Sequence, residues 1–182
     1  RLLGQGAPPA VFDTDPIPRF ALSNPCWPNR FRLFVRRESG KAGVLPFTNR
    51  YQTRAEWADC DPLGQTFYPN YFRWFDIGTH TLLDAAGHPY DGLIEKYGLA
   101  GLPLVDAQAS FRGRCRWTDD LEIESFISRF GSKSFTVTHN IWNGGDVAVE
   151  GKEVRIWGLF DPEDDTKLMA GEIPEDFKQI FA

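Results

Sequence analysis

The residues from Trp57 to Asp76 read W-A-D-C-D-P-L-G-Q-T-F-Y-P-N-Y-F-R-W-F-D, and they pass from a strand end through a turn into a helix. Pro69 suits the first position of a helix, where its missing N–H would be unbonded anyway. The free amides at a helix start attract negative charge. A carboxylate that faces them across a small gap can attack a carbonyl or activate water while the amides hold the developing oxyanion. The stretch therefore predicts a site for acyl chemistry built on Asp61.

Regular patterns extend from this stretch in both directions. Apolar and polar residues alternate from Phe47 to Trp57, which predicts a half-buried strand. Apolar residues then recur every three or four positions from Pro69 to Ala86, which predicts a long helix that Gly87 ends. A strand, a long helix and an antiparallel meander predict an α+β fold, with a five-stranded antiparallel sheet wrapped around one central helix. The remaining predicted elements are strands at about 102–113, 121–130, 133–142 and 147–160, a hairpin turn at 143–146, and helices at 91–98 and 173–181.

Composition restricts the function classes. The chain has 182 residues, enough for one domain with a sizeable core. A formal net charge of −5 and a pI of about 5.2 argue against a general nucleic-acid binder, which needs a basic face. No apolar run approaches the roughly 20 residues that a membrane-spanning helix requires. The three cysteines are widely spaced and lack a C-x-x-C motif, which favours reduced thiols in the cytoplasm.

The first 46 residues differ from the rest. They hold seven of the thirteen prolines and show no sustained helical or strand period. We expect 1–46 to form an irregular extension without functional residues, and 47–182 to form the folded domain.

Plainer interpretations of the central stretch have to be considered beside the catalytic one. Asp61 to Gly64 is also what an ordinary turn looks like, since Asp, Pro and Gly are common turn formers. Cys60 lies between two acidic residues, but no basic partner that could activate it is recognisable nearby in sequence. The three histidines are scattered without H-x-H or H-E-x-x-H spacing, so no metal site is predicted. The chain also lacks the G-x-S-x-G motif of serine hydrolases.

The longer pattern favours catalysis over a plain turn. D-x-D-P-x-G followed by F-Y-P-N-Y-F-R-W-F-D closely resembles the active-site signature of the 4-hydroxybenzoyl-CoA thioesterase family, and the resemblance covers roughly Phe47 to Phe181. It implies the hot-dog fold and hydrolysis of an acyl-CoA thioester without a metal or a cofactor, because CoA is part of the substrate. It also implies a homodimer or homotetramer whose pocket lies between two subunits.

The same resemblance implies roles for individual residues. Asp61 would be the catalytic carboxylate, and the backbone N–H of Tyr68 would hold the thioester carbonyl. Asp59 would be the less important acid, with a structural hydrogen bond into the turn. Lys133 would contact the CoA phosphates, although Gly131 and Ser132 stand where family members carry basic residues. The other expected substrate contacts are Gly64, Asn70, Asp76 and Ser110, each of which also has an ordinary structural interpretation.

Several alternatives stay open at this point. Asp61 could add to the carbonyl or deprotonate a water, and the carrier could be CoA or an acyl carrier protein. Aromatic residues beside Asp61 are compatible with an aryl acyl group, but they are equally compatible with a core. Arg112, Arg114 and Arg116 form a second basic patch of open purpose. The rival functions are a non-catalytic acyl-thioester binder and, with less support, an enoyl-CoA hydratase, which needs an Asp/His pair.

Overall fold

A computed structural model describes residues 46–181. The predicted extension lies outside the described residues except for Pro46, so the domain boundary at 47 stays a prediction. The elements, in chain order, are β1 (Thr48–Arg54), the short 3-10 helix η1 (Trp57–Asp59), α1 (Pro69–Ala85), α2 (Tyr90–Tyr97), β2 (Leu99–Gly101), β3 (Leu104–Phe111), β4 (Asp120–Phe130), β5 (Ser134–Asn143), β6 (Asp146–Ile156), β7 (Gly158–Asp161), β8 (Asp164–Ala170) and α3 (Glu175–Phe181).

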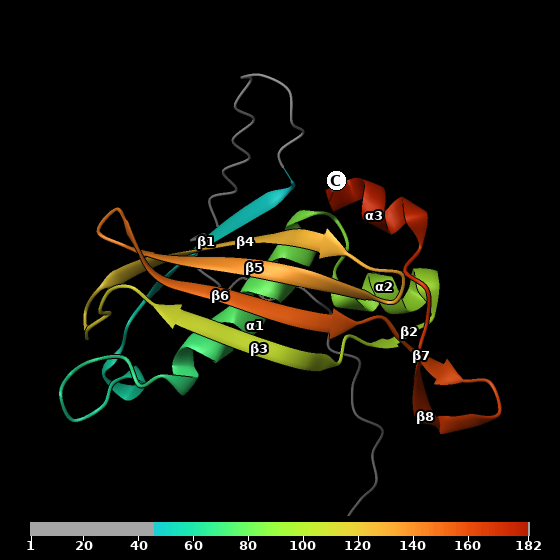
Figure 1. Cartoon of the computed structure of the whole chain (residues 1–182), viewed down its shortest axis with the longest axis horizontal. Coiled ribbons are helices and arrows are strands. Elements are labelled where there is room, and N and C mark those ends of the chain that lie inside the picture. Colours follow the sequence, from blue (N-terminus) through green and yellow to red (C-terminus); the bar gives the residue numbers. More distant parts are fainter. Residues whose placement is uncertain (1–45, 182) are drawn as a thin grey trace, which may run out of the picture.

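The main sheet has five antiparallel strands in the order β1-β4-β5-β6-β3. The long helix α1 crosses one face of this sheet, and α2 and α3 lie at one end (Figure 1). The α+β prediction with a five-stranded sheet and one central helix is thereby confirmed. α1 begins at Pro69, as predicted, and Gly87 follows its end with a positive φ of 78°.

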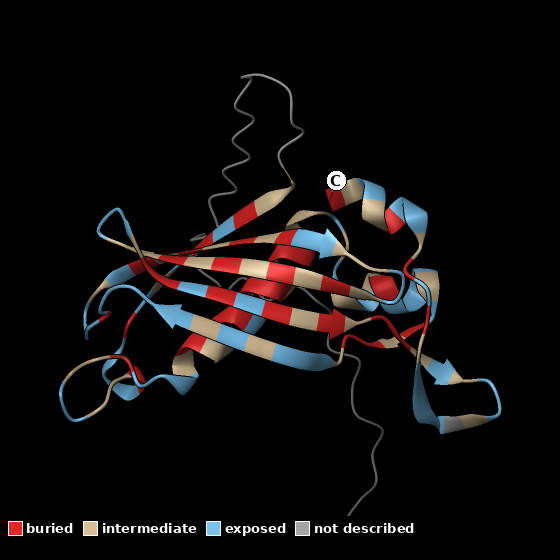
Figure 2. Ribbon diagram, in the orientation of Figure 1, coloured by how far each residue is buried: buried red, intermediate tan, exposed pale blue. Residues whose placement is uncertain are grey.

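The core lies between α1 and the sheet (Figure 2). The first half of α1 buries Tyr71, Trp74 and Phe75 against central strands, and the second half buries Leu82 and Leu83. The second group belongs to a larger cluster that α2 and α3 close with the aromatic and aliphatic side chains of Leu93, Phe177 and Phe181.

Two glycines allow α1 to approach the sheet closely. A Cβ on Gly78 would lie 2.6 Å from Ser125 Oγ, and a Cβ on Gly151 would lie 2.3 Å from the ring of Phe75. Both distances are shorter than real Cβ contacts, so each position requires the absence of a side chain. The middle of α1 is therefore held directly on β4, β5 and β6.

A second, smaller sheet was not predicted. β2, β7 and β8 form three antiparallel strands beside the main sheet. The strand predicted at about 102–113 corresponds to β3, and β2 before it was not predicted. The strand predicted at 147–160 is divided at Trp157 into β6 and β7. The N–H of Trp157 donates to Lys133 O at 2.9 Å, next to the last pair of the β5–β6 ladder, Ser134 with Ile156.

Candidate active site

The Asp61 loop, defined here as residues 59–68, connects η1 to α1. It closes on itself, since Asp61 N donates to Gln65 O at 2.7 Å and Gly64 N donates to Asp61 O at 2.9 Å. Gly64 has a φ of 70°, a conformation that glycine adopts without strain. A Cβ at this position would meet nothing within 4 Å, so within one chain Gly64 is needed for the turn rather than for space.

The carboxylate of Asp61 is held by only one of its oxygens. Oδ1 accepts hydrogen bonds from Leu63 N at 2.8 Å and from Gln65 N at 3.2 Å. Oδ2 has no hydrogen-bond partner among residues 46–181. The two amides stabilise the negative charge and fix the group, while the second oxygen stays available to a ligand.

The start of α1 contributes a free amide to the same loop. Asn70 N donates to Phe67 O at 3.0 Å and Tyr71 N donates to Tyr68 O at 3.2 Å, but the N–H of Tyr68 has no acceptor in the described chain. Pro69 has no N–H to offer. The unpaired donor at this helix start is therefore the amide of Tyr68, and the positive end of the helix dipole adds to its attraction for negative charge.

Asp59, unlike Asp61, has hydrogen-bond donors for both of its carboxylate oxygens. Its side chain is buried, and its two oxygens accept from Glu56 N at 3.0 Å and from the guanidinium of Arg73. Its carbonyl also accepts from Phe67 N at 2.8 Å and from Asn70 Nδ2 at 2.9 Å. Asp59 thus ties the beginning of the loop to its end, and Asn70 has a structural partner there. The hydrogen bonds of the Asp59 carboxylate reach Glu56 and α1 rather than the turn itself.

Cys60 is poorly suited to act as a nucleophile. Partial burial, together with the nearby charges of Asp59 and Asp61, raises the pKa of its thiol. A raised pKa lowers the fraction of the reactive thiolate.

Asp76 lies about two turns after the start of α1, and it contacts the guanidinium group of Arg155, which was not predicted from the sequence. Its carboxylate accepts from Arg155 Nη2 at 2.6 Å, and the Nε2 atom of His80 lies 3.9 Å away. Arg155 is 5% exposed and also donates to Glu153 Oε2, with distances of 3.1 Å from Nε and 2.8 Å from Nη2. The sequence feature that could have indicated this contact lies in β6, where Glu153 and Arg155 occupy alternate positions that are buried.

A buried polar cluster, consisting of Thr79, Ser125, His139, Glu153 and Arg155, continues from Asp76 into the core. Thr79 Oγ1 donates to Glu153 Oε2 at 2.9 Å, and Ser125 Oγ lies 2.8 Å from His139 Nδ1. The His139 ring stacks on Phe75 at 4.9 Å, and its Nε2 atom lies 3.5 Å from Glu153 Oε2.

The charges of this cluster follow from its burial. Burial lowers the pKa of His139, so the imidazole is neutral near pH 7. Burial alone would raise the pKa of Glu153, but His139 and the guanidinium of Arg155 outweigh it and the pKa is lowered. Glu153 is therefore an ionised carboxylate that Arg155 neutralises.

Two predicted substrate contacts lie away from the Asp61 loop. Ser110 is exposed on β3, the edge strand, opposite Glu150 of β6. Lys133 is exposed in the turn between β4 and β5, whereas the Asp61 loop lies at the Asp120 end of β4. An eleven-residue strand such as β4 spans on the order of 30 Å. Within one chain, Asp61, Gly64, Tyr68 and Asn70 are brought together, and Lys133 is not.

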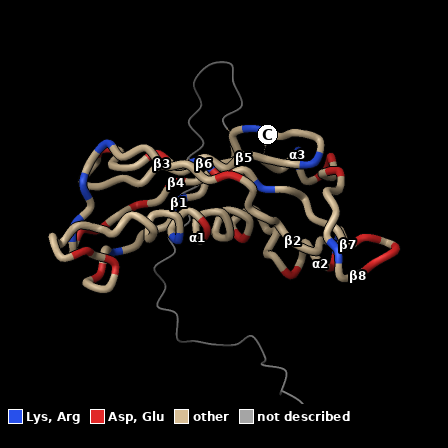
Figure 3. Tube along the Cα trace, turned by 60° about the horizontal axis from the view of Figure 1, so that its bottom comes forward, with Lys and Arg blue, Asp and Glu red and all other residues tan. Residues whose placement is uncertain are grey.

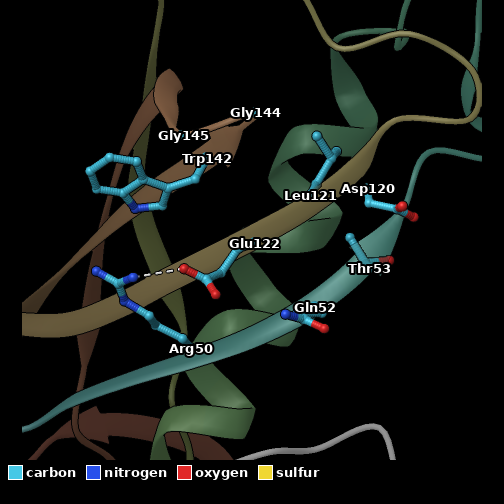
Figure 4. A pocket seen from close by; sticks show the side chains of 9 residues that line it. All are labelled: Arg50, Gln52, Thr53, Asp120, Leu121, Glu122, Trp142, Gly144 and Gly145. Carbon is cyan, nitrogen blue, oxygen red and sulfur yellow. Dashed lines mark hydrogen bonds and ion pairs between the residues drawn. The ribbon is translucent and has the colours of Figure 1, made fainter. Parts of the chain in front are cut away.

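The described residues also form a groove of about 770 Å³ on the sheet face opposite α1 (Figure 4). Arg50 crosses it, donating to Glu122 at 2.7 Å with its guanidinium 5.6 Å from the centre of the Trp142 ring. None of the predicted site residues lines it. Residues 46–181 contain no group of three or more His, Cys, Asp or Glu side chains that could hold a metal, and none of the helices in this range is long and apolar enough to cross a membrane.

Comparison with known proteins connects this geometry to a family. A sequence model of the thioesterase superfamily matches residues 63–150. The chain is 33% identical over 135 residues to 4-hydroxybenzoyl-CoA thioesterase from Pseudomonas sp. (strain CBS-3). The aligned region covers 71% of this chain and 94% of that enzyme. The chain belongs to the thioesterase superfamily. The predicted resemblance and the hot-dog fold that it implied are confirmed.

Solved structures of thioesterase superfamily members superpose on this chain. A mutant of 4-hydroxybenzoyl CoA thioesterase, with an aspartate replaced by asparagine and complexed with 4-hydroxybenzoyl CoA, matches with a TM-score of 0.67 and 31% identity over 75% of this chain and 99% of that one. A gentisyl-coenzyme A thioesterase matches with a TM-score of 0.62 and 32% identity over 71% of this chain and 99% of that one.

Proposed function

We propose that this protein hydrolyses an acyl-CoA thioester to the free acid and CoA, with Asp61 as the reacting carboxylate and the N–H of Tyr68 as the oxyanion donor. The observation that carries the proposal is that two groups of one closed loop, Asp61 Oδ2 and the Tyr68 N–H, have no partner among the described residues. One supplies anionic attack and the other stabilises the negative charge that develops on the carbonyl oxygen.

The chemistry can follow either of two routes. In the first, Asp61 Oδ2 bonds to the carbonyl carbon, the C–S bond breaks, and water hydrolyses the resulting mixed anhydride. In the second, Asp61 takes a proton from a water whose oxygen adds to the carbonyl, and that proton passes to the departing CoA sulfur. In both routes a carboxylate, an amide and water are sufficient, so we propose that the reaction uses no metal or redox cofactor.

The acyl group is proposed to be aromatic. Exposed aromatic rings surround the Asp61 loop in two edge-to-face pairs, Trp57 with Trp117 at 5.4 Å and Phe67 with Tyr68 at 5.2 Å. Exposed rings of this kind bury large apolar area when a flat ligand packs on them. The two named relatives act on 4-hydroxybenzoyl and gentisyl thioesters, which supports an aryl group.

We further propose that the active unit is a homodimer or a homotetramer. β3 pairs with β6 on one side and is an edge strand of the main sheet, and Leu104, Val105 and Phe111 on it are exposed. An exposed apolar edge favours pairing with a second copy. Antiparallel pairing of two β3 strands would place Ser110 in the interface. It would also bring the Lys133 turn of the second copy to the end of the sheet that carries Asp61.

Free thiols at Cys60 and Cys115 are consistent with a reducing compartment, and we propose the cytoplasm as the location.

The proposal is tested with a panel of acyl-CoA esters and a thiol reagent that reports free CoA. The panel contains 4-hydroxybenzoyl-, gentisyl- and benzoyl-CoA beside short straight and branched aliphatic esters. We expect release of thiol, fastest with the aryl esters. Tight binding of the same esters without release would replace the enzyme by the acyl-thioester binder. Turnover of aliphatic esters alone would overturn the aryl assignment but keep the thioesterase.

A further inference from the structure

Three arginines follow β3 at alternate positions, 112, 114 and 116. Cys115, which lies between Arg114 and Arg116, is buried and fixes the segment to the domain. Arg114 and Arg116 are exposed. Lys and Arg positions gather along this end of the molecule (Figure 3).

The three arginines differ in their partners. Arg112 is neutralised by Glu150, to which its Nε and Nη2 atoms donate at 2.9 Å and 2.8 Å. The guanidinium groups of Arg114 and Arg116 form no ion pair and no hydrogen bond within residues 46–181. Asp119, the nearest acid in sequence, already accepts from Arg116 N at 2.8 Å and from Asn143 Nδ2 at 2.7 Å. Among residues 46–181, these two cations are thus left without a counter-charge.

The backbone of this segment is bonded to the Asp61 loop. Thr66 N donates to Cys115 O at 2.8 Å, Trp117 N donates to Gly64 O at 3.2 Å, and Gln65 and Arg116 form an antiparallel bridge. The other side is held by Asn143, whose Nδ2 donates to Arg114 O at 3.0 Å. Because both sides are fixed, the backbone that carries Arg114 and Arg116 is held beside the loop that carries Asp61.

Resting on the proposed function, we propose that Arg114 and Arg116 bind the phosphates of the CoA nucleotide. Arginine forks bind phosphate oxygens in pairs and keep their charge at any physiological pH. In an acyl-CoA the pantetheine arm separates the thioester from the phosphates, so a phosphate site has to lie beside the reacting centre rather than in it. The Lys133 turn has one cation flanked by Gly131 and Ser132, and it lies at the far end of the sheet in the same chain. Arg114 and Arg116 supply two cations in the same chain as Asp61, whereas Lys133 supplies one and reaches the Asp61 end of the sheet only from a second copy.

The test compares the double variant Arg114→Ala/Arg116→Ala with Arg112→Ala and Lys133→Ala. Each is assayed with an aryl-CoA and with the N-acetylcysteamine thioester of the same acid, which lacks all phosphates. We expect the double variant to raise KM for the CoA ester by roughly tenfold or more, with kcat unchanged and with no change for the truncated ester. Arg112→Ala, which removes a charge that is already paired, should change KM by less than about twofold.

Calorimetric titration with CoA, dephospho-CoA and pantetheine gives a second readout that does not depend on turnover. We expect the wild type to bind CoA more tightly than pantetheine, and the double variant to lose that difference while its thermal melting stays unchanged. If Lys133→Ala abolished the difference and the double variant kept it, the assignment would be wrong. Arginine-dependent CoA binding in a protein that hydrolyses no ester would support the phosphate site and overturn the proposed function.

Discussion

The Asp61 loop and the buried polar cluster under α1 both contain carboxylates, but these differ in burial and in their hydrogen-bond partners. In the cluster, Glu153 accepts from Thr79 and Arg155 and is sealed from water. In the loop, one oxygen of Asp61 and the amide of Tyr68 have no partner within the part of the chain that the structure describes. Removing one partner of a charge pair in the core destabilises the fold because the other charge is left buried and uncompensated, whereas a fixed charge with a free oxygen at the surface is available for chemistry.

The largest effect on stability should come from Glu153→Ala. This change leaves the buried guanidinium of Arg155 with only the half-exposed Asp76 as a counter-ion, so we expect a loss of about 3–5 kcal/mol in the free energy of unfolding. Glu150→Ala removes an exposed carboxylate from the same strand and should cost less than about 1 kcal/mol. Urea unfolding of both variants measures the difference. Equal losses would mean that the buried cluster is not what stabilises this part of the fold.

A smaller loss is expected from Gly78→Ala. The new methyl group would lie 2.6 Å from Ser125 Oγ and 3.1 Å from His139 Nδ1, so the helix or the cluster has to move at a cost of about 1–3 kcal/mol. The matched control is Gly92→Ala in α2, where the nearest atom is 3.5 Å away. Higher helix propensity should stabilise that variant by up to about 1 kcal/mol. The two changes should therefore shift the melting temperature in opposite directions.

The buried cluster should also make the fold sensitive to acid. Because burial lowers the pKa of His139 below its ordinary value of 6.5, the unfolded chain binds a proton at higher pH than the folded chain does. Stability should therefore be greatest above pH 6.5 and fall below it, by at most about 1.4 kcal/mol per pH unit for this group. The lowered pKa of Glu153 acts in the same direction, since its contribution is present above its ordinary value of 4.5 and is lost at lower pH.

Unfolding measured at a series of pH values, for the wild type and for His139→Gln, isolates the histidine. The variant should be less stable at pH 7 but should lose less stability between pH 7 and pH 5. Parallel curves for the two proteins would show that His139 is not protonated in this range on unfolding.

The features that could be predicted from sequence are those with local causes. Pro69 marked the start of α1, and the spacing of its apolar residues gave its length. Asp61 and Gly64 marked the turn because their backbone conformations are set within a few residues. β8 was missed because its acidic start reads as a turn, and the strand pairs with β7 only in the folded chain.

The parts of the site that could not be predicted depend on contacts between distant segments. Asp76 and Arg155 are 79 positions apart, and no local pattern pairs them. In the same way, the place of Arg116 beside the Asp61 loop follows from its bridge to Gln65. The family resemblance implied a phosphate contact at Lys133 and left the purpose of Arg112, Arg114 and Arg116 open, because no local pattern shows that the arginine segment is bonded to the Asp61 loop.

The central claim is that Asp61, unlike Asp59, carries the chemistry, and the steady-state kcat of Asp61→Asn on the best aryl-CoA tests it most directly. Asparagine preserves the size of the side chain but can neither attack as a carboxylate nor accept a proton efficiently. We expect kcat to fall by roughly 10²-fold or more with folding and substrate binding retained, and Asp59→Asn to lower kcat less and stability more. A kcat of Asp61→Asn near that of the wild type would contradict the account.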